Sequence, residues 1–285
     1  MLLDWRKQGH PGTMGEPRIP LDPVADLKVR LARESTDQAR AFWARLFLAS
    51  RAGGSGPGSP GMFYGVPMAK VAGCVRAWWT DHGLSEHPAT VGKRVALALI
   101  EQPMIEDKLA GILVLQDLLG TQLRASDLPA FARLFASGHL AEWNVVEWFV
   151  MKVLVTLLDR PSGRREVARG LAQWRTTSTT WQRRAACLAF IKLAPLGEAA
   201  LPGLTEHILT ICGTVVWSHE PHDQTAVGCV LRELARAEPA KVEAFFRRHA
   251  LLMSKECARH AVAKFPAPLR AELLAHHKRA TSLRH

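Results

Sequence analysis

The sequence contains a single tyrosine, five cysteines and no apolar run long enough to span a bilayer. The cysteines are odd in number, and no two of them form a CxxC pair: Cys74, Cys187, Cys212, Cys229 and Cys257. This pattern predicts neither a disulfide framework nor a zinc site, and it is typical of reduced thiols in a cytosolic protein. The missing apolar run excludes a membrane span, so we expect no membrane partner.

The sequence also lacks strand patterns, because no segment alternates convincingly between apolar and polar residues. Apolar residues instead recur at helical spacing, in segments that break at Gly, Pro, Asp or Ser. The predicted helices are Pro23–Arg33, Thr36–Ser50, Met68–His82, Pro88–Glu101, Ile105–Thr121, Asp127–Ser137, Trp143–Arg160, Gly163–Trp174, Thr179–Ala194, Ala199–Val216, Asp223–Ala237, Pro239–His249, Ser254–Phe265 and Ala267–Ala280. The sequence therefore predicts an all-α fold.

Each predicted helix is amphipathic and cannot bury its apolar stripe alone. Repeated antiparallel pairs of such helices are typical of an α-solenoid, whose concave face suits a long ligand. We predict one repeat domain over residues 21–282, preceded by a flexible lead at residues 1–20. Residues 51–63, which are rich in Gly and Pro, are predicted to form a loop.

Acidic residues are few relative to basic ones, with 26 Asp and Glu against 37 Lys and Arg, a net charge of +11. A folded domain this basic usually has an anionic partner, most often nucleic acid. A membrane surface is the weaker alternative, since no Lys-rich amphipathic helix stands out.

Trp143 and Glu147 bring an aromatic ring and a carboxylate together on one helix. The two residues are four apart, so their side chains lie one turn above each other on the same side. A ring face and a carboxylate both stabilise positive charge, which makes the pair a candidate catalytic site. A Trp at the rim of the core beside a solvated Glu is the alternative.

Three further features surround this candidate site in the sequence. Arg183 and Arg184 open a helix, where the helix dipole favours acids, so they suggest an external anion such as phosphate; surface arginines are the alternative. Gly228 lies inside a helix at a cost of about 1 kcal/mol relative to Ala, which indicates a close approach or tight helix packing. The loop Ser218–Asp223 collects possible metal ligands, but its spacing matches no closed site, and we expect a helix N-cap and no metal.

Four motifs carry a resemblance to a known family, and they cover roughly Tyr64 to Phe265. They are Tyr64-Gly65-Val66-Pro67, Trp143-x-x-x-Glu147, Trp181-x-Arg183-Arg184-Ala-Ala, and Ala226-Val227-Gly228-Cys229-x-Leu231-Arg232-Glu233-Leu234. In this order and at this spacing they resemble the AlkD-type DNA alkylation repair family.

The resemblance implies a HEAT-like helical repeat protein whose concave basic face grips duplex DNA. It further implies a DNA glycosylase that removes cationic N3- or N7-alkylated purines without a metal or other cofactor. A monomer in the bacterial cytosol or nucleoid is expected.

The resemblance also assigns roles to individual residues. Trp143 matches a sugar-contacting aromatic, Glu147 falls where the family commonly has Asp, and Arg184 matches an arginine that holds the DNA backbone. Cys229 replaces a second sugar-contacting Trp, and Thr225 stands where a Lys is common. The remaining expected DNA-binding residues are Arg183, Tyr64, Trp181 and Arg232.

Two functions stay open on the sequence. Trp143, Glu147 and Arg184 favour a monofunctional alkylpurine glycosylase. Cys229 and Thr225 favour a non-catalytic HEAT-repeat module that recognises damaged or branched DNA. A protein-binding solenoid would explain neither the basic balance nor the order of the motifs.

Overall fold

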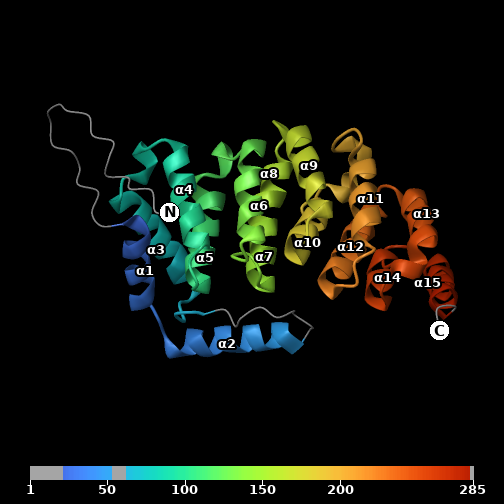
Figure 1. Cartoon of the computed structure of the whole chain (residues 1–285), viewed down its shortest axis with the longest axis horizontal. Helices are drawn as coiled ribbons and strands as arrows, with labels where there is room; N and C mark the ends of the chain where they lie inside the picture. Colours follow the sequence, from blue (N-terminus) through green and yellow to red (C-terminus); the bar gives the residue numbers. More distant parts are fainter. Residues whose placement is uncertain (1–21, 53–61, 283–285) are drawn as a thin grey trace.

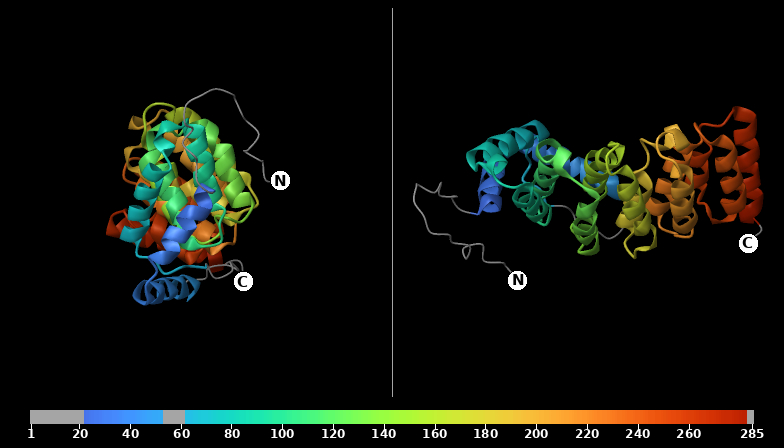
Figure 2. Two further views of the ribbon diagram at one scale, coloured as in Figure 1. Left: turned by 90° about the vertical axis from the view of Figure 1, so that its left-hand side faces the viewer. Right: turned by 90° about the horizontal axis from the view of Figure 1, so that it is seen from above.

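The computed structural model describes residues 22–52 and 62–282, whose helices follow one another in chain order along an elongated molecule (Figures 1 and 2). The lead expected at residues 1–20 lies outside the described residues, as does most of the loop expected at 51–63. Met62, at the end of that loop, forms an isolated bridge with Met104.

The described residues form fifteen α-helices and no strand, so the predicted all-α fold is confirmed. The helices are α1 (Pro23–Arg33), α2 (Asp37–Ala52), α3 (Met68–Asp81), α4 (Ala89–Ile100), α5 (Ile105–Leu113), α6 (Leu128–Ala136), α7 (Trp143–Phe149), α8 (Val155–Asp159), α9 (Arg164–Ala172), α10 (Thr180–Leu188), α11 (Leu204–Val215), α12 (Pro221–Leu234), α13 (Pro239–His249), α14 (Lys255–Ala261) and α15 (Ala267–Ser282).

Two layers of helices make up the solenoid. In one layer, which we call the site layer, α3, α5, α7, α10, α12 and α14 each pack against the next. In the other layer, α1 packs against α4, and α9 packs against both α6 and α11. The amphipathic stripes meet between the layers, where one hydrophobic core runs from Leu27 to Leu273. The predicted stacking of helix pairs is therefore confirmed.

Two helices of the site layer contain a π-helical turn. The turn Val114–Leu118 continues α5, and the turn Val150–Leu154 joins α7 to α8. The segment predicted as one helix from Trp143 to Arg160 is thus continuous to Asp159 but changes its winding after Phe149. Single π turns inside α-helices occur frequently at functional sites.

The Tyr64–Pro67 motif, which precedes α3, lies against both α2 and α5. The carboxylate of Glu106, in the first turn of α5, accepts hydrogen bonds from the backbone N–H groups of Tyr64, Gly65 and Val66 at 2.8–3.0 Å. Gly65 has φ +93°, and a Cβ there would lie 2.8 Å from Cβ of Arg40 on α2. Only glycine suits this backbone conformation and this close approach.

Gly228 lets α12 lie directly against α14. A Cβ at this position would meet the carbonyl oxygen of Cys257 at 2.7 Å and Cβ of His260 at 2.8 Å. Of the two explanations that the sequence leaves open for this glycine, the structure supports tight helix packing.

Candidate functional site

Helix α7 is anchored so that one side faces the core and the other faces outward. Glu142 caps its N-terminus, with Oε2 accepting from the backbone N–H of Val145 at 2.9 Å. Phe149 packs edge-on against Phe131 and Phe135 of α6, with ring centroids 5.3 and 5.9 Å apart. These contacts fix both the start and the rotation of the helix.

Trp143 and Glu147 lie on the outward side of α7. Trp143 is 37% exposed, and the side chain of Glu147 is 30% exposed. The apolar residues predicted to form the opposite stripe are all buried: Val145, Val146, Phe149, Val153, Leu154 and Leu157. The sequence pattern therefore placed both faces of this helix correctly.

Arg184 reaches from α10 to Glu147. Its Nε donates to Oε1 of Glu147 at 2.7 Å, and its Nη2 lies 2.6 Å from the same oxygen. Its Nη1 donates to the carbonyl oxygen of His222 at 2.7 Å and to Oγ1 of Thr225 at 2.9 Å. Arg184 is only 6% exposed, so this guanidinium is locked between α7, α10 and α12.

The first turn of α12 lies next to Arg184. The imidazole of His222 stacks on the indole of Trp181, with centroids 4.6 Å apart and ring planes at 32°. Burial and the neighbouring Arg184 guanidinium lower the pKa of His222. A neutral imidazole at this position adds no second positive charge beside Arg184.

Cys229 lies one turn beyond Thr225 on α12 and is half-buried. Burial raises the pKa of its thiol, and the charged groups that act on the thiol include Arg232, Arg184 and Glu147. Cys229 is therefore a neutral side chain beside the Glu147–Arg184 pair. We call Trp143, Glu147, Arg184, Thr225 and Cys229 the α7–α12 cluster.

Arg183 has a different environment from its neighbour. Its Nε and Nη2 bond Oδ2 of Asp223 at 2.8 and 2.6 Å, and Asp223 is fully buried. Its Nη1 donates to the carbonyl oxygens of Thr177 and Ser178, and Nη2 also donates to Oγ1 of Thr180. The guanidinium has five N–H donors, and all five have acceptors inside the protein. Arg183 thus has an internal carboxylate as its partner in this structure, and its expected contact with DNA stays a prediction.

Two other residues expected at the DNA have no direct bond to Glu147 or Arg184, although the charge of Arg232 acts on the thiol of Cys229. The Tyr64 hydroxyl donates to Oδ2 of Asp107 on α5 at 3.1 Å. Arg232 lies on α12 beyond Cys229, and its Nε donates to Oε1 of Glu233 at 2.7 Å. Neither residue has a hydrogen bond or ion pair to Glu147 or Arg184.

The loop Ser218–Asp223 leads into α12, as its N-cap pattern predicts, although the helix begins at Pro221 instead of Asp223. Within residues 22–52 and 62–282, no group of three or more His, Cys, Asp or Glu side chains is arranged to hold a metal ion. Nor does any helix in these ranges have the length and apolar composition to cross a bilayer.

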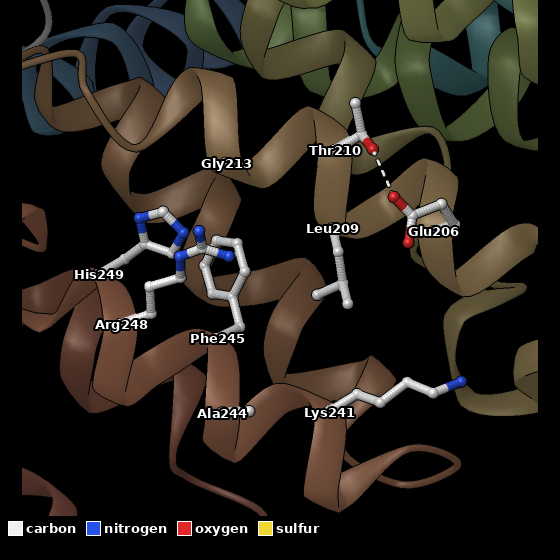
Figure 3. A pocket seen from close by; sticks show the side chains of 9 residues that line it. All are labelled: Glu206, Leu209, Thr210, Gly213, Lys241, Ala244, Phe245, Arg248 and His249. Atoms are coloured by element: carbon white, nitrogen blue, oxygen red, sulfur yellow. Dashed lines mark hydrogen bonds between the residues drawn. The ribbon is translucent and has the colours of Figure 1, made fainter.

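A cavity of about 390 Å³ lies away from this cluster, between α11 and α13 (Figure 3). Leu209, Ala244 and Phe245 line it together with Lys241 and Arg248. None of the residues of the α7–α12 cluster contributes to it.

Sequence reasoning missed the contribution of His222 and Asp223 to this region. The signal that could have identified them is the position of both residues in the first turn of α12. In a helical repeat, each unit packs against its neighbour, and equivalent helices begin at the same edge. The first turn of α12 is therefore expected to contact the first turn of α10, which carries Arg183 and Arg184.

Comparison with known proteins identifies the family of the chain. A family model described as DNA alkylation repair enzyme matches residues 29–265. No curated protein and no solved structure gives a significant match. The family match covers most of the described helices and the whole α7–α12 cluster, and the chain belongs to the DNA alkylation repair enzyme family.

Proposed function

We propose that this protein is a monofunctional DNA glycosylase that hydrolyses the N-glycosidic bond of cationic N3- or N7-alkylated purines in duplex DNA. The observation that carries the proposal is the pairing of an outward-facing Trp143 with Glu147, whose carboxylate is held in place by Arg184. Family membership supports a role in repair of alkylated DNA.

The chemistry follows from the charge of the substrate. An alkylated purine with a positive charge is a good leaving group, because it departs as a neutral base. Its departure leaves an oxocarbenium-like deoxyribose, as in other glycosidic cleavages. Water then adds to the anomeric carbon and loses a proton to solvent, which leaves an abasic site.

Trp143 and Glu147 would stabilise the positive charge that the alkylated base carries at first and that the deoxyribose carries after the base departs. The indole face attracts a cationic base or sugar by a cation–π contact worth about 0.5–2 kcal/mol, depending on desolvation. The Glu147 carboxylate stabilises the sugar cation electrostatically, and such a preorganised group is typically worth about 10²–10³ in rate.

Arg184 would position Glu147 for this role. A carboxylate held by two guanidinium nitrogens does not reorganise when the sugar cation forms, which is the condition for efficient electrostatic stabilisation. The same pairing offsets part of the negative charge. This offset, together with a thiol at Cys229 where the related proteins have an aromatic wall, favours the second candidate function, a DNA-binding module without catalysis.

Release of free base separates the two candidates. Duplex DNA carrying radiolabelled methyl groups would be incubated with the protein, and soluble 7-methylguanine and 3-methyladenine would be measured. The glycosylase predicts release of both bases with one abasic site for each. Tight binding of the methylated duplex without base release would instead establish the non-catalytic module.

A further inference from the structure

The loop between α11 and α12 exposes a tryptophan that the proposed chemistry does not use. Trp217 is 65% exposed. Leu251, in the turn before α14, is also exposed, at 41%. Large exposed aromatic side chains on a rigid surface are enriched at binding interfaces.

Gln224 holds both loops in place. This residue is 2% exposed, and its Nε2 donates to the carbonyl oxygens of Val216 and Ser218, each at 2.8 Å, and of Leu252 at 3.1 Å. Its Oε1 accepts from the backbone N–H of Ser254 at 2.9 Å. One buried amide thus fixes the backbone on both sides of Trp217 and next to Leu251, so these side chains are presented at little entropic cost.

The same turn of α12 connects this loop to the α7–α12 cluster. His222 accepts from Arg184, Asp223 accepts from Arg183, and Gln224 holds the loops of Trp217 and Leu251. Three consecutive residues therefore link α10 on one side to the start of α14 on the other. Figure 1 shows α7, α10, α12 and α14 side by side in the lower half of the molecule.

The charges beside this loop suit a polyanion. Lys255 and Arg259, four residues apart on α14, are both exposed and have no acidic partner among the described side chains. The exposed acids nearby are Glu220 in the same loop and Glu256, which lies 3.6 Å from His260. The whole chain carries a net charge of +11. Duplex DNA is therefore the partner that fits an exposed indole in a loop whose backbone is tied through Gln224 to the start of α14, the helix that carries both cations.

We propose that Trp217, in the loop that leads into α12, is a non-ionic contact point for duplex DNA beside the α7–α12 cluster, with Lys255 on α14 as a phosphate contact. This inference rests on the proposed function, because it extends the same DNA interface. An indole can stack on a base or on a deoxyribose without reading sequence, as stacking aromatics do in other nucleic-acid-binding proteins. It would hold the duplex in register while Trp143 and Glu147 face the lesion.

Salt-dependent binding of a labelled undamaged duplex tests the proposal in the full-length chain. Trp217→Ala should weaken binding about fivefold or more at every salt concentration and leave the slope of log affinity against log salt unchanged. Lys255→Ala should flatten that slope by about 1, as expected for the loss of one phosphate contact. Trp217→Phe should retain most of the affinity.

Leu196→Ala is the matched control, since Leu196 is 55% exposed in the connection between α10 and α11, at the other end of the helices. It should bind DNA as the wild type does, and all variants should keep the wild-type melting temperature. If the wild type binds duplex and Trp217→Ala binds equally well, Trp217 is not part of the interface. If the wild type itself does not bind duplex at low salt, the proposed function and this inference are both wrong.

Discussion

The Nε atom of Arg184 donates to Oε1 of Glu147 across 2.7 Å, joining α10 to α7. The next residue along the chain, Arg183, bonds Asp223 instead, at 2.6 Å. Two adjacent arginines thus hold two different carboxylates, one partly exposed and one fully buried. Because Asp223 is fully buried, we expect the loss of Arg183 to affect the stability of the fold.

Arg183→Met should mainly destabilise the fold. Removing one partner of a buried ion pair leaves an uncompensated charge, here on Asp223, and typically costs about 3–5 kcal/mol. Arg236→Met is the matched control, because Arg236 is 57% exposed and lies 3.7 Å from Glu233; a surface pair contributes about 0–1 kcal/mol. Chemical denaturation measures the free energy of unfolding of both variants. If both lose the same small amount of stability, Arg183 does not form a buried ion pair.

Gly228→Ala should destabilise the packing of α12 on α14. The new Cβ would lie 2.7 Å from a backbone carbonyl oxygen, which cannot move without shifting α14. Overpacking of this kind costs about 1–3 kcal/mol. Gly73→Ala is the control: Gly73 also lies inside a helix, but a Cβ there meets nothing within 4 Å, so the change should stabilise by up to about 1 kcal/mol. If Gly228→Ala leaves the free energy of unfolding unchanged, α14 does not pack directly against this glycine.

Cys229→Trp should raise the single-turnover rate of 7-methylguanine excision several-fold, up to roughly tenfold, with little change in duplex affinity. The added indole would supply a cation–π contact worth about 0.5–2 kcal/mol, and 1.36 kcal/mol corresponds to tenfold in rate. Because Cys229 is half-buried, a Trp could also overpack the site. A variant that melts markedly lower and gains no excision rate would show that this position does not face the lesion.

Asp107→Asn should change how stability depends on pH. Burial raises the pKa of Asp107 to about 6, above its value of about 3.9 in an unfolded chain. The folded state therefore binds this proton more tightly, and the stabilisation, complete below about pH 4, is lost as the pH rises through 6. The unfolding free energy of the variant relative to the wild type should increase by about 2 kcal/mol between pH 4 and pH 7.

The control for this titration is Asp117→Asn, since Asp117 is exposed on the π turn that continues α5. The same pH series on this variant measures the change in stability that follows from losing one exposed carboxylate. A pH-independent difference for Asp107→Asn would contradict a buried carboxyl that protonates near pH 6.

Much of the fold could be predicted because apolar spacing alone determines which face of each helix is buried. The helices Pro23–Arg33 and Pro239–His249 begin and end where the sequence predicts, since a proline marks the first residue of each and arginines occupy the last turn of each. The helix expected to run from Thr179 to Ala194 ends at Leu188, and the one expected from Ala199 begins at Leu204. Between the two helices, Gly197 has φ +54° and Gly203, directly before α11, has φ +83°, so the chain leaves the helical path there.

The candidate site was predictable only in part, for a related reason. The spacing of Trp143 and Glu147 places both on one face of one helix, which needs no tertiary information. The ion pairs of Arg183 and Arg184 span 40 and 37 residues, and helical periodicity contains no information about contacts between repeats. The π turn after Phe149 was also invisible, because a change in winding leaves the apolar stripe intact.

The rate of 7-methylguanine excision by Glu147→Gln, measured in single turnover on methylated duplex, tests the central claim most directly. The amide oxygen can still accept from Arg184, so the change removes the negative charge without removing the contact. The predicted result is a loss of about 10²–10³ in rate, with Glu147→Asp largely active and with exposed Glu166→Gln on α9 as fast as the wild type. Excision by Glu147→Gln at the wild-type rate would contradict the claim that this carboxylate stabilises the sugar cation.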